Sequence, residues 1–195
     1  MTNHAIPARR PSFAAIAGLL VAAIGSAGHA QPAWPPQHSR DGFAARLLQA
    51  HNAERAPFGA QPLAWDPSLA VAADAYAAEL AATGKWGHSA PHQRVGQGEN
   101  LWMGTRGAFS LEHMMANWAS EKSMFRPGVF PNVSTTGKWE DVGHFSQIIW
   151  PGTRRVGCGL RSSARDDYLV CRYTEPGNVM GEAVPRPVSV ASNQR

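Results

Sequence analysis

Residues 143–150 (GHFSQIIW) place an imidazole and two polar side chains directly beside an aromatic and aliphatic block. Polar groups next to a buried block need partners, because a buried polar group without a hydrogen bond is costly. Three residues elsewhere in the chain are candidates for these partners, namely His88, Glu99 and Glu121. Together with His144, they would give a pocket two imidazoles and two carboxylates, which suits either a cation site or an acid–base site.

Glu121 is selected because it continues the apolar stripe of a helix predicted to begin near Ser110. Leu111, Met114 and Trp118 recur at steps of three and four, and Glu121 follows three residues later. A carboxylate on a buried helix face is costly unless it is paired. The alternative is that the helix end frays and Glu121 faces water.

The N-terminus reads as an export signal. A pair of arginines precedes an apolar run over 13–27 that is short for a membrane span, and small residues at 28 and 30 follow it. We therefore expect a secretory signal peptide over 1–30, with an N-terminal membrane anchor as the alternative. Phe13 is out of place for a twin-arginine signal, so the general secretory route is preferred.

The sequence after the predicted signal peptide is expected to form a single domain. Residues 1–30 contain two arginines and no acidic residue, so their removal lowers the formal net charge from +4 to +2. The remaining Lys and Arg residues form no basic cluster along the sequence, which argues against nucleic-acid binding.

We expect a proline-rich linker over 31–40, a domain over 41–182 and a flexible tail over 183–195. The mature protein is expected to be a monomer, extracellular or periplasmic, with no stable membrane span.

Cys158 and Cys171 are the only cysteines of the chain. An isolated pair in a secreted protein most often forms one disulfide. Residues 156–160 and 168–173 read as two strands around a polar hairpin loop, which places the two cysteines opposite each other. Closing this loop should stabilise the fold by about 3 kcal/mol in the chain-entropy picture. The bond also uses both thiols, which disfavours a thiol nucleophile or a cysteine-ligated metal.

Two further helices have clear local signals. The first can be capped by Asp41 and should end before Pro57, with an apolar side that includes Leu47. The second has Asp66 as its cap, proline at its first position and Gly84 as its stop. Periodicity alone leaves residues 144–150 ambiguous between helix and strand.

Four segments, taken together and in order, resemble the CAP superfamily of cysteine-rich secretory proteins, venom antigens and plant pathogenesis-related proteins. These segments are His51-Asn52-x-x-Arg55, Gly98-Glu99-Asn100-Leu101, residues 143–150 and residues 169–178. The resemblance, to a bacterial-type secreted member, implies an α+β fold, a three-layer α-β-α sandwich with a central antiparallel sheet. It also favours a short helix with His144 near its N-terminus.

The same resemblance implies a site. Its cavity residues would be His88, Glu99, Glu121 and His144. The two histidines would bind zinc or another divalent cation directly, and the two glutamates would help through water or by supporting the histidines. The alternative is a buried, hydrogen-bonded network of histidines and glutamates that stabilises the cavity without a metal. Asn100 and Gln147 would hold the loop and the histidine in place. Arg172 replaces an asparagine that is common in relatives, a change expected to affect the sheet rather than the cavity.

Function is left with three interpretations, and no catalytic residue is assigned. The first is a secreted binding protein for a lipid or sterol, with a cavity able to take a metal. The second is a hydrolase or protease with a histidine base and Ser89 or Ser146 as nucleophile, although no Gly-x-Ser-x-Gly elbow is present. The third is an extracellular module that binds another protein and whose pocket is vestigial. His51, Asn52 and Arg55 are interpreted as structural anchors.

Overall fold

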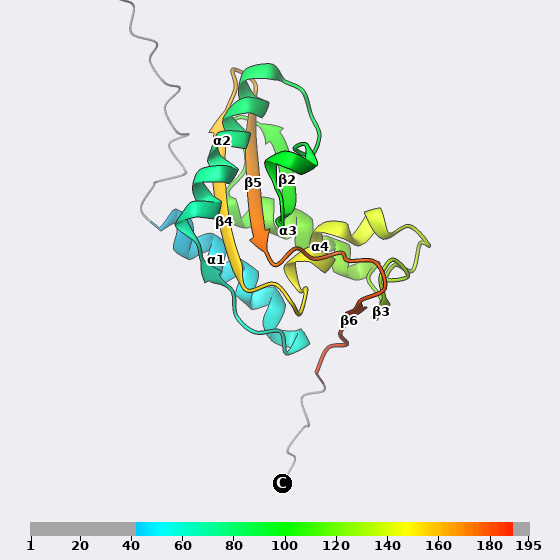
Figure 1. Cartoon of the computed structure of the whole chain (residues 1–195). Coiled ribbons are helices and arrows are strands. Elements are labelled where there is room, and N and C mark those ends of the chain that lie inside the picture. The colour runs from blue at the N-terminus through cyan, green and yellow to red at the C-terminus, as the bar shows by residue number, and fades with distance from the viewer. Residues whose placement is uncertain (1–41, 189–195) are drawn as a thin grey trace, which may run out of the picture. The chain divides into compact units, whose positions relative to one another are not determined.

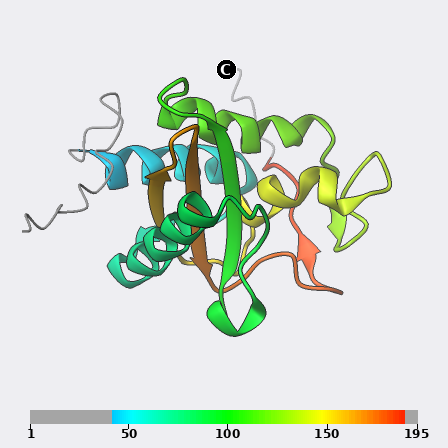
Figure 2. The same ribbon diagram turned by 90° about the horizontal axis from the view of Figure 1, so that it is seen from above.

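A four-stranded sheet lies between one long helix and a layer of three shorter helices (Figures 1 and 2). The structure, a computed structural model, describes residues 42–188. The predicted signal peptide, the predicted linker and the predicted cap Asp41 lie outside these residues. Within residues 42–188, no helix is long and apolar enough to cross a membrane.

The sheet has the strand order β1-β4-β5-β2. Its strands are β1 (Ala64–Trp65), β2 (Gly98–Thr105), β4 (Arg155–Ser162) and β5 (Asp166–Thr174). Pairing is antiparallel between β4 and β5 and between β5 and β2, as expected for a hairpin joined to a further strand. The short strand β1, which the sequence did not indicate, adds to β4 in parallel and makes the sheet mixed.

Helices cover both faces of this sheet. Helix α2 (Pro67–Thr83) packs along β4 and β5 on one face. Helices α1 (Phe43–Arg55), α3 (Leu111–Ser120) and α4 (Gly143–Ile148) contact one another on the other side, as Figure 2 shows. The predicted α-β-α sandwich is therefore confirmed, and residues 143–148 are a short helix.

Local sequence signals set the ends of α2. The Asp66 carboxylate accepts hydrogen bonds from the backbone N–H groups of Ser68 and Leu69, and Gly84 ends the helix with φ 67°. The helix also lies unusually close to the sheet. A Cβ atom at Gly157 would fall 2.2 Å from the backbone nitrogen of Ala70, so glycine is needed at this point of β4.

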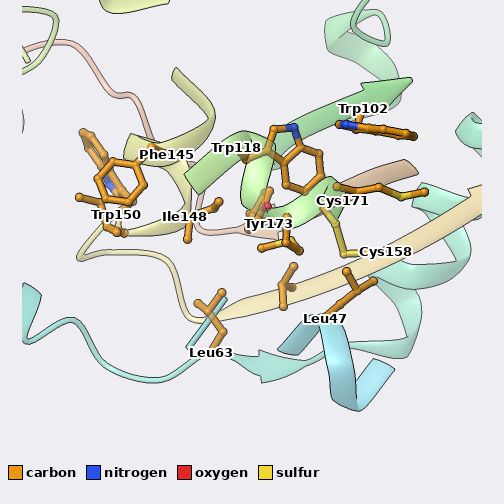
Figure 3. Packing of buried hydrophobic residues seen from close by; sticks show 14 of the residues in the cluster. Leu47, Leu63, Trp102, Trp118, Phe145, Ile148, Trp150, Cys158, Cys171 and Tyr173 are labelled. Carbon is orange, nitrogen blue, oxygen red and sulfur yellow. A yellow bond between two sulfur atoms is a disulfide. The ribbon is translucent and has the colours of Figure 1, made fainter. Parts of the chain in front are cut away.

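The larger part of the core fills the space between the sheet and the three shorter helices (Figure 3). Cys158 and Cys171 are paired in register on β4 and β5 and form the predicted disulfide within it. Trp118, Phe145 and Trp150 are also buried there. A smaller cluster packs under α2 and includes Tyr76, Leu80 and Leu101. The apolar block after His144 is thus core, as the sequence indicated.

Short elements complete the described fold. They are the 3-10 turns η1 (Ala56–Phe58), η2 (Pro91–Gln93), η3 (Glu121–Ser123) and η4 (Trp139–Val142), and the paired strands β3 (Gly128–Val129) and β6 (Ala183–Val184). Strand β6 lies inside the tail that we predicted to begin at residue 183. Val184 is buried, and the backbone N–H of Val188 donates to the carbonyl of Pro57. Ordered structure therefore continues past residue 182.

Candidate functional site

A hollow of about 420 Å³ lies at β2, one of the two edge strands of the sheet. Residues from three segments line it, within 88–100, 139–147 and 176–178. Both candidate histidines line this hollow, together with Glu99, Asn100 and Gln147. The structure thus brings together predicted site residues that are far apart in the sequence.

His144 is held by Glu121. Its Nδ1 lies 2.6 Å from Glu121 Oε1, and the other carboxylate oxygen accepts the backbone N–H of Phe145 at 2.9 Å. The His144 ring also stacks on Trp118, with the ring planes 16° apart. Glu121 is not among the residues that line the hollow, so it contributes through His144. Its side chain is 15% exposed and paired, which answers the alternative of a frayed, solvated end.

His88 is held in the same way by Glu99, with 2.8 Å between Nδ1 and Oε1. Glu99 is far more buried, because its side chain is only 1% exposed. It also accepts hydrogen bonds from the backbone N–H and the hydroxyl of Ser89. Burial opposes ionisation, but the hydrogen bonds and a nearby cation outweigh it, and the pKa of Glu99 lies below its usual value.

That cation is Arg172, whose Nε lies 2.9 Å from Glu99 Oε2. The two residues are direct partners across β2 and β5, and both side chains are almost completely buried. The guanidinium also donates to the Ser89 hydroxyl and lies over the ring of Tyr76. The expectation that Arg172 affects the sheet rather than the cavity is therefore wrong, because strand pairing aligns it with a cavity residue.

Asn100 and Gln147 hold the walls of the hollow. The Asn100 amide donates to the carbonyl of His144, and Gln147 Oε1 accepts the backbone N–H of Gly177. A Cβ atom at Gly98 would fall 2.1 Å from Gln147 Oε1, so the strand needs glycine to admit this side chain. The supporting role implied by the resemblance agrees with these contacts.

The polar residues of α1 are structural anchors, as predicted. His51 is fully buried between the carbonyl of Leu47 and the hydroxyl of Tyr173. Asn52 exchanges hydrogen bonds with the backbone of Leu63. Arg55 donates to four carbonyls, those of Gln61, Ile148, Trp150 and Thr153. These contacts tie α1 to the segment that leaves α4.

The donor set fits an open cation site better than a closed one. Each site histidine bonds a carboxylate through Nδ1, which leaves Nε2 without a protein partner among the described residues. Metal-binding histidines commonly use this carboxylate support. Within residues 42–188, however, no three His, Cys, Asp or Glu side chains lie close enough together to hold a metal. Two imidazoles would therefore need water or a ligand to complete the coordination.

Neither candidate nucleophile contacts an imidazole in the described residues. The Ser89 hydroxyl donates to Glu99, and the Ser146 hydroxyl donates to Asn178 Oδ1 at 2.6 Å. A serine nucleophile needs a base within hydrogen-bonding distance. The described geometry therefore gives no support to a serine hydrolase.

Several lining residues were missed by sequence reasoning. Arg94, Trp139 and Glu140 lie in loops or 3-10 turns, where hydrophobic periodicity gives no signal. Asn178 belongs to a motif that we noted, but its contact with Ser146 required the fold. A second, more apolar hollow of about 330 Å³ lies between α1 and α2 and is lined in part by Trp65, Val71 and Cys158.

Comparison with known proteins supports the assignment of the fold and shows the family. Residues 48–173 match the sequence model of CAP, the Cysteine-rich secretory protein family. The chain is 35% identical to Pathogenesis-related protein 1C of Nicotiana tabacum, over 70% of this chain and 77% of that protein. It is 34% identical to Protein PRY2 of Saccharomyces cerevisiae, over 72% of this chain and 39% of that protein.

Solved structures show the same fold. The crystal structure of NaASP2 with Zn²⁺ superposes with a TM-score of 0.63 at 24% identity, over 80% of this chain and 91% of that one. The relatives named above come from a plant and a yeast, so the bacterial-type assignment stays a prediction. The matched sequence model, the relatives and the sandwich fold agree, and the chain belongs to the Cysteine-rich secretory protein (CAP) family.

Proposed function

We propose that this chain is a secreted binding protein whose polar hollow takes a divalent cation, zinc, through Nε2 of His88 and His144. The observation that carries the proposal is that both imidazoles line one hollow, each with Nδ1 held by its own carboxylate. Since a carboxylate accepts at Nδ1, the neutral ring keeps its lone pair on Nε2. The remaining coordination positions would be left for water or a ligand.

Separate observations support the secretion and the metal binding in this proposal. The disulfide between Cys158 and Cys171 suits an oxidising compartment, and the N-terminal sequence is typical of an export signal. NaASP2, which shares the fold, was solved with Zn²⁺. At 24% identity that likeness concerns the fold, so the argument for metal rests on the two histidines of this chain.

Zinc titration followed by thermal unfolding tests the proposal, because only the folded chain assembles both ligands. We expect the melting temperature to rise with zinc and the rise to disappear in His88→Ala and in His144→Ala. His92→Ala is the matched control, because His92 is an exposed histidine that does not line the hollow. Zinc stabilisation that persists in the double His88→Ala, His144→Ala variant would refute the site.

A lipid or sterol ligand is a second candidate, favoured by the apolar hollow between α1 and α2. Trp65 and Val71 line it, and Val71 is 71% exposed. Such a ligand should co-purify with the secreted protein and be displaced when Val71 is replaced by Asp. Mass spectrometry of organic extracts would detect it, and equal lipid in both variants would count against this hollow.

A further inference from the structure

Three nitrogen-bearing side chains, from different positions in the chain, lie at or near the buried carboxylate of Glu99. His88 and Arg172 contact it directly, at 2.8 Å and 2.9 Å. Arg94 lies nearby but donates its Nε to the backbone carbonyl of Ser89 at 3.1 Å. The negative charge of Glu99 is therefore already balanced by Arg172, and Arg94 forms no ion pair with Glu99.

Arg94 is fixed and faces the same hollow as both histidines. Its side chain is half-buried, and its bond to the Ser89 carbonyl engages only Nε. Among the described residues, no carboxylate forms an ion pair with Arg94. The two terminal nitrogens of its guanidinium therefore have no hydrogen-bond or ion-pair partner among the described residues. A planar pair of N–H donors matches a carboxylate or a phosphate.

Electrostatics point the same way. The like charge of Arg94 adds to burial in lowering the pKa of Arg172, so the two guanidinium groups repel each other. A bound anion beside Arg94 would relieve this repulsion. Glu140, on the segment that also carries His144, lines the hollow and forms no ion pair among the described residues. Its charge disfavours a ligand with several negative groups.

We infer that the hollow binds a ligand through one anionic group, a carboxylate or a phosphate, which Arg94 pairs beside His88. The inference takes the proposed ligand site as its location, but it requires no metal. Arg94 then determines which ligands bind, since the other polar side chains of the hollow are amides, imidazoles and two carboxylates, of which that of Glu99 is already paired. The ligand beyond its anionic group should be neutral or carry hydrogen-bond donors, because Glu140 accepts.

The test is an NMR titration of the full chain in the presence of a chelator, near pH 7.5, where an ordinary imidazole is about nine-tenths neutral. The probes are N-acetylglycine, its uncharged amide N-acetylglycinamide, and inorganic phosphate. Binding is followed by the Arg94 Nε–H signal and the backbone N–H of Glu99. We expect N-acetylglycine, phosphate or both to shift these signals and the amide to leave them unchanged.

Substitutions identify the residue responsible. Arg94→Gln should weaken binding about tenfold, since a hydrogen bond to a charged group is lost. Arg94→Lys keeps the charge and should retain most of the affinity. The matched control is Arg106→Gln, which removes an exposed arginine outside the hollow whose guanidinium also donates to a backbone carbonyl. Equal binding by Arg94→Gln, or equal shifts with the amide, would overturn the inference.

The two probes separate the sources of the anion. Shifts with N-acetylglycine alone assign a carboxylate ligand, and shifts with phosphate alone assign a phosphate ligand. Shifts with both show that Arg94 recognises the negative charge without distinguishing a carboxylate from a phosphate. Repeating the N-acetylglycine arm with zinc separates this inference from the metal proposal. Arg94-dependent binding without zinc stabilisation would remove only the metal, and zinc stabilisation without anion binding would remove only this inference.

Discussion

The two histidine–glutamate pairs of the hollow have the same chemistry but different surroundings. In one pair, the Glu99 side chain is 1% exposed and His88 is 55% exposed. In the other, Glu121 is 15% exposed and His144 is 34% exposed. Of these two glutamates, only Glu99 lies within ion-pair distance of an arginine or lysine among the described residues, and that residue is Arg172. The difference is that the buried carboxylate of Glu99 has a counter-charge beside it, whereas the partly exposed carboxylate of Glu121 is satisfied by the His144 ring and the backbone N–H of Phe145.

The largest effect should come from removing that counter-charge. Arg172→Met should destabilise the fold by about 3–5 kcal/mol, because it leaves the buried carboxylate of Glu99 without its cation. Chemical denaturation would measure the loss as a lower midpoint. The double variant Arg172→Met, Glu99→Gln should recover part of this stability, since the unpaired charge is removed. A double variant no more stable than Arg172→Met would mean that packing, not charge, explains the loss.

A second prediction concerns the stability that the fold loses at low pH because of the buried His51, which belongs to neither histidine–glutamate pair. Burial lowers the pKa of His51 to about 4, and its hydrogen bond to Leu47 only partly opposes this. As pH falls, His51 therefore becomes protonated in the unfolded chain at a higher pH than in the folded protein. The contribution of the neutral His51 to the free energy of unfolding is fully present above pH 6.5 and is lost as pH falls toward 4. The loss should reach about 3 kcal/mol.

Denaturation midpoints measured between neutral pH and about pH 4 would check this prediction. His51→Gln should show a smaller loss over that range, because glutamine does not take up a proton. Its stability at neutral pH should be lower, since the bonds to Leu47 and Tyr173 are disturbed. An identical pH dependence in the two proteins would contradict the assignment to His51.

Zinc tests whether the two pairs act as one site. At a hundredfold excess over its dissociation constant, zinc should stabilise the wild-type protein by about 2.7 kcal/mol. His88→Ala and His144→Ala should each abolish this gain if both imidazoles bind the same ion. A gain that survives in one variant but not in the other would show that a single pair binds the metal.

The smallest effect should distinguish the supporting carboxylates. Glu99→Gln and Glu121→Gln should each weaken zinc binding about tenfold, because they orient the imidazoles without binding the metal. The two variants should differ in stability without zinc. Glu99→Gln leaves Arg172 buried without an anion, whereas Glu121→Gln affects a partly exposed contact. Equal stabilities, measured by chemical denaturation, would contradict the comparison.

Much of the fold could be predicted from short-range signals. The Asp66 cap and the Gly84 stop bound α2 as expected, and two strand-like runs around a polar loop placed the two cysteines opposite each other. Such signals depend on neighbouring residues, so they survive in the sequence. The helical stripe also indicated that Glu121 needs a partner, and the structure supplies His144.

The sequence by itself indicated α1, α2, α3 and the hairpin with its disulfide, and the family resemblance proposed four cavity residues, of which His88, Glu99 and His144 line the hollow. Only the tertiary structure decided that Glu121 acts through His144, that Arg172 neutralises Glu99 and that Arg94 faces the hollow. These contacts depend on the pairing of β2 with β5 and on loop paths between elements. No local pattern encodes such contacts, because they form between residues that meet only after the sheet has assembled.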